Sequence, residues 1–376
     1  MAKTLRAAVI GSTNRGGYGH GLDTTFIGVD GVELIAVADD DPDGLALAGR
    51  RLGVRALYND YREMLAKEKP DIVSIGPRWV TDRVAMIEAA AAVGCHIHCE
   101  KPLAGTLTDL DAILAACDKA HVQISVAHQW RTMPPVRQAI RDLKAGKFGR
   151  LLRMRARPKD DARGGGEELN VHGTHLFDLM MAFAGRPRWV SGHVLVNHRD
   201  ATRDDRQEGT EPVGPIAGDS ISAMFGFDKG VRGFFDSTAN LSLGGETVFD
   251  NLYGLFLECE KGALHLRQPG DVFVYPAPLN LPDIAELSWE RIWIEAWHFT
   301  PEHKRRPVRQ IWLRHGNAVL ARDVIEAIHT GRKPISSGHE VRFVMEMIQG
   351  VYASHLADGR RLSIPLVDRR HPLHSA

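Results

Sequence analysis

Short apolar segments alternate with longer amphipathic segments over the first third of the chain, from Leu5 to about Val126. The apolar segments predict buried strands, and the amphipathic ones predict helices. We expect strands at residues 7–10, 32–38, 72–75, 95–99 and 122–126, and helices at residues 45–52, 60–67, 81–93 and 107–120. This alternation predicts a parallel sheet with helices on both faces, which binds ligands at the carboxyl ends of its strands.

The pattern changes beyond about Ile124. We expect a helix at residues 133–148, strands at residues 151–156, 190–196, 220–227, 231–237, 252–258 and 263–268, and helices at residues 318–329 and 340–355. Glycine-bearing turns between the strands indicate an antiparallel arrangement. Residues 199–218 are polar and rich in Gly and Pro, which predicts an exposed loop or a lid over the site. Two domains are therefore expected, at residues 1–125 and 126–376.

The composition narrows the choice of partners. A chain of 376 residues with 44% hydrophobic and 25% charged residues is typical of a globular protein. Its 47 basic and 47 acidic residues give zero net charge, which excludes the broad positive field used in nonspecific nucleic-acid or anionic-membrane binding. We therefore expect a small molecule or a protein as partner, and neither nucleic acid nor membrane.

The cysteine and histidine content bears on the cellular compartment and on proton transfer. Four cysteines are too few for a disulfide framework in a chain of this length. The apolar stretch Ala7–Ile10 is shorter than a signal-peptide core, and no segment approaches the roughly 20 apolar residues of a membrane span. A reducing, cytoplasmic location is expected. The 18 histidines include candidates for proton transfer, because imidazole titrates near neutral pH.

A glycine-rich turn follows the first expected strand. Here Gly11-Ser-Thr-Asn-Arg-Gly16-Gly17 precedes a helix that we expect to begin near His20. Such a turn lets backbone N–H groups and the helix N-terminus face the pyrophosphate of a dinucleotide. Thr13 stands where the G-x-G-x-x-G pattern has its middle glycine, so the segment also fits a tight turn without a ligand. The cofactor contacts predicted in this segment are Gly11, Thr13, Asn14, Arg15 and Gly16.

An acidic residue at the end of the second strand strengthens the dinucleotide interpretation. Asp39 ends this strand and is followed by Asp40 and Asp41. A carboxylate there accepts hydrogen bonds from the adenosine ribose of NAD and repels the 2′-phosphate of NADP. The alternative is a helix cap, with Asp41 at the N-cap and Pro42 at the first helical position. Both fit together, so we expect NAD rather than NADP, with Asp39 on the ribose.

Four further segments carry a family resemblance. They are Glu100-Lys101-Pro102, Gln129-Trp130-Arg131 with Pro134, Gly173-Thr-His175-Leu-Phe-Asp178, and Gly359–Pro365. With them, nearly the whole chain resembles the Gfo/Idh/MocA oxidoreductases. The resemblance implies an α/β fold: an N-terminal Rossmann domain with a doubly wound parallel sheet that carries NAD(P), and a C-terminal α/β domain with a large, mostly antiparallel open sheet. It also implies that the second domain supplies substrate contacts and oligomer interfaces.

The same resemblance implies roles for individual residues. Lys101 corresponds to the family's site lysine and His175 to its site histidine, so we expect these two to be catalytic. A histidine removes the hydroxyl proton of an alcohol near neutral pH, and a lysine ammonium stabilises the alkoxide that develops. The further cofactor contacts implied are Gly76, Pro77, Glu100, Lys101 and Gln129, and the substrate contacts implied are His128, Trp130, Arg131, His172 and Asp178.

The sequence departs from the family pattern most seriously at Val171. This residue stands four positions before His175, where the family commonly has an aspartate that orients or shares the imidazole proton. Either His172 or Glu168 takes over this role, or His175 works with Lys101 alone, or the usual catalysis is lost.

Three other departures are smaller. Thr13 replaces a glycine, and Gln129 stands where the family often has asparagine. A histidine that is common early in the helix expected at residues 81–93 is missing around Asp82 and Arg83.

One group of side chains imitates a metal site. Glu168, His172, His175 and Asp178 would share a face of a continuous helix. Gly173 disfavours such a helix, and the family's histidine works beside NAD, so no metal is expected.

The function expected is hydride transfer from a ring CH–OH of a sugar, glycoside or cyclitol to NAD, in a homodimer or homotetramer formed through the C-terminal sheet. One alternative is an NAD-dependent glycoside hydrolase that acts by transient oxidation and elimination. A second is a non-catalytic NAD-binding sensor or regulator. Val171 leaves room for both alternatives, whereas Lys101 and His175 favour catalysis.

Overall fold

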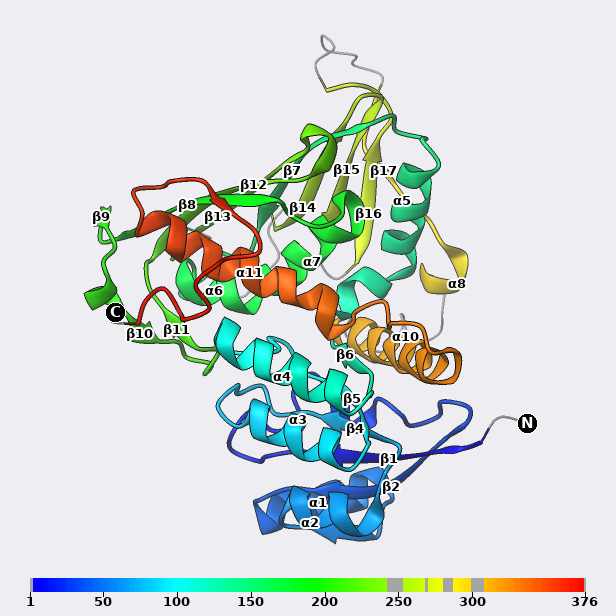
Figure 1. The fold of residues 1–376 in the computed structure, drawn as a ribbon. Coiled ribbons are helices and arrows are strands. Elements are labelled where there is room, and N and C mark those ends of the chain that lie inside the picture. Colours follow the sequence, from blue (N-terminus) through cyan, green and yellow to red (C-terminus); the bar gives the residue numbers. More distant parts are fainter. Residues whose placement is uncertain (1–2, 242–252, 268–269, 280–286, 299–307, 375–376) are drawn as a thin grey trace. The chain divides into compact units, whose positions relative to one another are not determined.

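A computed structural model describes residues 3–241, 253–267, 270–279, 287–298 and 308–374 of the chain. The chain divides into two compact units, each with a large β-sheet of its own (Figure 1). The first unit comprises residues 1–129, 211–214 and 313–342, and the second comprises residues 130–210, 215–312 and 343–376. Both units are therefore assembled from stretches that are distant in sequence.

The first unit contains a six-stranded parallel sheet in the order β3-β2-β1-β4-β5-β6. Its strands are β1 (Leu5–Ile10), β2 (Val32–Ala38), β3 (Ala56–Tyr58), β4 (Ile72–Ile75), β5 (His96–Cys99) and β6 (Ile124–Val126). The connecting helices are α1 (Pro42–Leu52), α2 (Tyr61–Glu68), α3 (Arg83–Ala92) and α4 (Leu107–Lys119). This is the doubly wound order, in which ligands bind where the direction of winding reverses, beside β1 and β4. The expected parallel sheet is confirmed, and β3 is an edge strand that the pattern did not predict.

The start of α1 follows the predicted cap. Asp41 is the N-cap and its carboxylate accepts a hydrogen bond of 2.7 Å from the Gly44 N–H, while Pro42 occupies the first turn. A carboxylate at this position satisfies an N–H group that has no partner within the helix. The second of the three consecutive acids, Asp40, is exposed, and the first, Asp39, is buried.

The prediction of a helix that begins near His20 is wrong. Residues 11–31 form turns with one short 3-10 helix, η1 (Leu22–Thr24). The residues with positive φ in this segment are Asn14, Gly16, Gly17, Gly19, Gly21, Gly28 and Gly31. Left-handed residues at such short spacing break a right-handed helix. The pyrophosphate argument therefore loses its helix N-terminus and rests on the backbone of the turn alone.

A helix from late in the chain covers the face of the sheet beside β1. Ala321, Val324 and Ile325 of α10 (Val308–Thr330) are buried in one cluster with Leu5 and Ala7 of β1. Residues contributed to the same cluster by the β1–β2 connection and by β4 are Phe26, Val29 and Ile72. Apolar side chains of a long-range helix thus complete the core of the first unit.

The second unit contains a ten-stranded mixed sheet in the order β17-β16-β15-β14-β7-β13-β12-β8-β18, with β9 paired to β8. Its strands are β7 (Leu151–Arg157), β8 (Trp189–Val196), β9 (Arg199–Asp200), β12 (Ser220–Gly226), β13 (Arg232–Thr238), β14 (Gly254–Cys259), β15 (Gly262–Arg267), β16 (Asp271–Tyr275), β17 (Glu290–Arg291) and β18 (Leu362–Ser363). Among these strands only β7 and β13 pair in parallel, so the mostly antiparallel sheet is confirmed.

Helices pack on one face of this sheet (Figure 1). The Phe177 ring of α7 (Gly173–Ala184) lies 5.0 Å from the Phe225 ring and 5.1 Å from the Phe235 ring. On the same face, Gly192 of β8 lies against Val351 of α11 (Gly338–His355). The other helices of this unit include α5 (Pro134–Lys144), α6 (Gly166–Val171) and α8 (Glu295–His298).

The segment at residues 199–218 differs from the expected exposed loop. It is mainly exposed as far as residue 210, and contains the short antiparallel pair β10 (Gln207–Glu208) and β11 (Pro215–Ile216). Val213, Ile216 and Ala217 are buried, so its second half contributes to the interior. Of the expected strands, the positions Leu252 and Gln268 lie outside the described residues. In the part of the chain that is described, no helix combines the length and apolar character needed to cross a membrane.

Candidate active site

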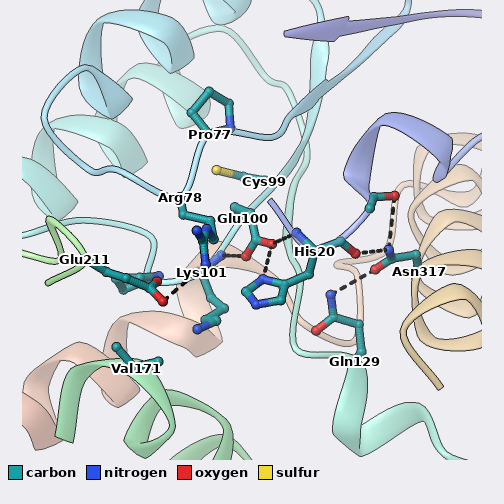
Figure 2. Close-up of polar contacts among 12 residues, drawn as sticks. His20, Pro77, Arg78, Cys99, Glu100, Lys101, Gln129, Val171, Glu211 and Asn317 are labelled. Carbon is teal, nitrogen blue, oxygen red and sulfur yellow. Dashed lines mark hydrogen bonds and ion pairs between the residues drawn. The ribbon is translucent and has the colours of Figure 1, made fainter. Parts of the chain in front are cut away.

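The turn after β5 carries Glu100 and Lys101, which are only 0% and 3% exposed. The Glu100 carboxylate accepts hydrogen bonds of 2.7 Å from the backbone N–H groups of His20 and Lys101, and lies 2.6 Å from His20 Nδ1 (Figure 2). Burial acts to raise the pKa of Glu100, but His20 and Lys101 offset this and lower the pKa to about 2. Glu100 is therefore ionised at neutral pH and holds both its neighbour Lys101 and the distant His20.

His20 is in turn held from α10. The Asn317 side chain donates a hydrogen bond of 3.0 Å to the His20 carbonyl and accepts one of 2.9 Å from Gln129 Nε2 (Figure 2). Gly19 permits this arrangement, because a Cβ at this left-handed residue would lie 2.4 Å from the Gly76 carbonyl oxygen and 2.5 Å from Glu100 Cγ. The predicted cofactor residues Glu100 and Gln129 are thus joined through His20 and Asn317, which we did not predict, and the predicted Gly76 lies against Gly19.

Arg83, the first residue of α3, also holds the turn after β5. The side chain is fully buried, and its guanidinium donates hydrogen bonds to the backbone carbonyls of Pro77, Glu100 and Pro102 and to Cys99 Sγ. One cation therefore ties the turn after β4 to the turn after β5. This arginine occupies the region where the family histidine is missing, and its role was not predicted.

The glycine-rich turn after β1 is held by the acids at the end of β2. The Asp39 carboxylate accepts hydrogen bonds from the Thr13 N–H at 2.9 Å and from the Thr13 hydroxyl at 2.7 Å, and Arg15 forms an ion pair with Asp82. The backbone N–H groups of Asn14 and Gly16 donate no hydrogen bond within the described residues. Free N–H groups in such a turn are suited to an anion, so the predicted pyrophosphate site keeps its donors.

The residues predicted around the site histidine lie in the second unit. His175 is 5% exposed on α7, and Val171, 3% exposed, ends α6. Between them, His172 Nδ1 lies 2.6 Å from the Glu168 carboxylate, which also forms an ion pair of 3.3 Å with Arg163. The two residues proposed to replace the family aspartate therefore form an acid–histidine pair with each other.

The predicted substrate contacts of the second unit form two small groups. Arg131 forms an ion pair of 2.7 Å with Asp178. The rings of Trp130 and His172 both lie edge-on to the ring of Tyr253, at centroid distances of 6.0 and 5.7 Å. Tyr253 was not predicted, and no local motif marks it. His128 belongs instead to the first unit, where its Nδ1 lies 3.4 Å from the Ser336 hydroxyl.

Lys101 and His175 belong to different units, so their expected cooperation stays a prediction. Within the first unit the structure brings together the β5 turn, Gln129 and His20, and in the second it brings together Glu168 and His172. Among the described residues, no group of three or more His, Cys, Asp or Glu side chains is arranged to hold a metal ion.

Comparison with known proteins finds relatives among the oxidoreductases. Residues 5–128 match the model named GFO_IDH_MocA, an oxidoreductase family with an NAD-binding Rossmann fold. Over 350 residues, the chain is 24% identical to D-apiose dehydrogenase of Rhizobium rhizogenes, and the match covers 89% of this chain and 91% of that relative. Residues 5–128 thus resemble the NAD-binding domain of the Gfo/Idh/MocA oxidoreductases, and a relative named as a dehydrogenase matches along most of the chain.

Other relatives and solved structures match over different lengths. D-apiose dehydrogenase of Paraburkholderia graminis is 36% identical over 121 residues, a match that spans only 32% of each chain. A solved structure of an oxidoreductase from Agrobacterium radiobacter, in complex with NAD⁺, L-tartaric acid and magnesium, has a TM-score of 0.74 at 19% identity, covering 96% of this chain and 99% of that one. A levoglucosan dehydrogenase in complex with NADH and levoglucosan has a TM-score of 0.72 at 18% identity and the same coverage. At these identities the structures support the fold.

Proposed function

We propose that this oxidoreductase is an NAD-dependent dehydrogenase that oxidises a ring CH–OH group of a sugar, glycoside or cyclitol. The observation that carries the proposal is the turn after β5, where Lys101 lies at the carboxyl edge of the parallel sheet and Glu100 holds its backbone N–H. In a doubly wound sheet this edge is where dinucleotide and substrate bind. The related D-apiose and myo-inositol dehydrogenases support carbohydrates and cyclitols as the substrate class.

The reaction removes a hydride from carbon and a proton from oxygen. NAD, when bound, accepts the hydride. The ammonium group of Lys101 stabilises the developing alkoxide, and His175 accepts the hydroxyl proton. The Glu168–His172 pair, next in the chain to Val171, supplies the carboxylate and imidazole that this chain has in place of the family aspartate.

The residues that hold the cofactor come from the first unit. The backbone N–H groups of Asn14 and Gly16 bind the pyrophosphate, and the predicted contacts Gly11, Thr13, Arg15, Gly76, Pro77 and Gln129 border the same edge of the sheet. The acids that follow β2 favour NAD over NADP, because a 2′-phosphate would meet negative charge there.

The test is turnover with NAD across a panel of sugars, glycosides and inositols, followed by the absorbance of NADH. We expect Lys101→Met to lower kcat at least a hundredfold with the best substrate, as for loss of other groups that stabilise a developing oxyanion. Binding of NAD, measured by calorimetry, should persist. Lys119→Met, at the exposed end of α4, is the matched control. Equal activity of Lys101→Met and the control would refute the proposal.

A second candidate activity follows from Val171, which is apolar and buried. An enzyme that cleaves a glycosidic bond by transient oxidation and elimination regenerates its NAD in each turnover. Release of the aglycone from a glycoside without net NADH would favour this activity. Tight NAD binding with neither NADH nor aglycone formed would favour the sensor function instead.

Two further properties complete the proposal. The face of the ten-stranded sheet opposite α7 and α11 carries the partly exposed Met224 and Phe234 beside the exposed Ser222, and we propose that it forms a homodimer or homotetramer contact, which sedimentation of the protein tests. The cytoplasmic location stays a prediction, supported by four free and buried cysteines. Intermolecular disulfides in the natively isolated protein would contradict it.

A further inference from the structure

The Asp39 carboxylate, directly after β2, already accepts hydrogen bonds from other groups of the chain. Asp39 is 1% exposed. One of its oxygens accepts hydrogen bonds from the N–H groups of Thr13 and Asp41, at 2.9 and 3.1 Å, and the other accepts the Thr13 hydroxyl at 2.7 Å. Two of these hydrogen bonds hold backbone N–H groups, and the third holds the Thr13 side chain. A ribose that claimed both oxygens of Asp39 would have to compete with the Thr13 side chain.

Thr13 has little room to move aside. A Cβ on Gly44, in the first turn of α1, would lie 2.0 Å from the Thr13 hydroxyl oxygen, so the threonine is packed directly against the helix. The middle glycine of the usual dinucleotide turn has no side chain and leaves the acid of β2 accessible to the ribose. In this chain the threonine takes that space and pairs with the acid.

The next acid along the chain has the opposite environment. The Asp40 side chain is 52% exposed. One of its oxygens accepts a hydrogen bond of 2.8 Å from the Ser12 hydroxyl, and the other lies 3.9 Å from an Arg15 nitrogen. Ser12 and Asp40 line a cavity of about 300 Å³ at the carboxyl ends of β1 and β2, together with Asn59, Tyr61 and Met86.

The charges around this cavity disfavour a phosphate. Its lining includes the carboxylates of Asp39, Asp40, Asp60 and Asp82 and the guanidinium groups of Arg15 and Arg62. Both arginines already have acidic partners, since Arg15 pairs with Asp82 and Arg62 lies 3.8 Å from Asp60. A neutral group with hydroxyl donors suits this lining better than a dianion.

We propose that Asp40, and not Asp39, is the carboxylate that binds the adenosine ribose hydroxyls and sets the preference for NAD over NADP. Asp39 is a positioning residue, which holds the glycine-rich turn through Thr13. The assignment rests on the dinucleotide cofactor of the proposed function. Cofactor specificity is thereby assigned to the exposed Asp40 instead of the buried Asp39.

The test measures binding of NADH and NADPH by fluorescence, without any substrate. Asp40→Asn should weaken NADH binding about tenfold or more, which is the usual effect of losing a hydrogen bond to a charged acceptor, and should strengthen NADPH binding. Asp39→Asn should weaken both cofactors in similar proportion and leave their ratio unchanged within about twofold, together with a lower Tm.

Two other variants keep the assignment testable if Asp39→Asn does not fold. Thr13→Val removes the hydroxyl that Asp39 accepts, and should lower the Tm without changing the cofactor ratio, whereas Asp43→Asn, an exposed acid in the first turn of α1, should change neither quantity. Tight NADH binding by the wild type with an unaltered ratio in Asp40→Asn overturns this assignment alone. A wild type that binds neither cofactor overturns the proposed function and the assignment together.

Discussion

Two turns at the carboxyl edge of the first unit's sheet are held in different ways. The turn after β5 is held by the fully buried Arg83 and Glu100, with partners from distant parts of the chain. The turn after β1 is held by Thr13 and Ser12, through part-buried hydrogen bonds to the acids that follow β2. A substitution in the turn after β5 leaves buried polar groups without hydrogen-bond partners. In the turn after β1, water can replace part of the lost hydrogen bonding. Substitutions should therefore destabilise the turn that carries Lys101 more than the turn after β1.

The largest effect should come from Arg83→Met. Removal of the guanidinium leaves the carbonyls of Pro77, Glu100 and Pro102 without this donor, and each stranded group costs about 1–3 kcal/mol. We expect the free energy of unfolding, from urea denaturation, to fall by about 3 kcal/mol or more, with partial recovery in Arg83→Lys. The exposed Arg55→Met is the control, with a change within about 0.5 kcal/mol. A loss below about 1 kcal/mol would mean that the buried cation does not hold this turn.

Glu100→Gln should have a smaller and pH-dependent effect. The pKa of Glu100 is lowered in the folded protein to about 2, so its carboxylate contributes stability that is fully present above the unfolded pKa of about 4.5. That contribution is lost as the pH falls through the folded value. At pH 7 we expect Glu100→Gln to lower the free energy of unfolding by about 2 kcal/mol. Denaturation at pH 7, 4.5 and 3 should show the difference from wild type shrinking as the pH falls.

The exposed Glu88→Gln serves as the control for this series, because it removes the same charge from the solvent side of α3. A difference between wild type and Glu100→Gln that is constant across the pH series would contradict the ionised, buried carboxylate.

The smallest effect should come from the turn after β1. Thr13→Val keeps the shape of the side chain and removes the hydroxyl that Asp39 accepts, which should cost about 1 kcal/mol. Thr13→Ser keeps the hydroxyl and should cost less. Urea denaturation of both variants checks the order. If Thr13→Val destabilised the protein as much as Arg83→Met, the contrast between the two turns would disappear.

Regular elements were predictable from the sequence where the local pattern was strong. Strands β2 and β4 have the expected bounds, because each is a short, mainly apolar segment flanked on both sides by Asp or Gly residues. The three-residue strand β3 is too short to show a period. The helix expected near His20 failed because closely spaced glycines adopt left-handed backbone conformations, which apolar periodicity does not report.

The sequence predicted the proposed catalytic and cofactor residues of the candidate site, but not the residues that hold them in place. Lys101 and Glu100 stand in a short segment with a family resemblance, which marks them directly. Arg83 and Asn317 carry no local signal, because their importance comes from partners on other elements, as with the Asn317 contacts to His20 and Gln129. Long-range hydrogen bonds of this kind leave no period or spacing in the sequence.

The position of α10 has a consequence for how this chain is made. Ala321, Val324 and Ile325 complete the cluster around β1, and Asn317 of the same helix holds the loop that carries His20. Domains generally fold as units during synthesis, beginning at the N-terminus. Here the ribosome translates every strand of the second unit's sheet except β18 before it reaches the helix that closes the first core. The N-terminal sheet therefore keeps an apolar face uncovered while the stretch from Val126 to Ala321, about half of the chain, is synthesised.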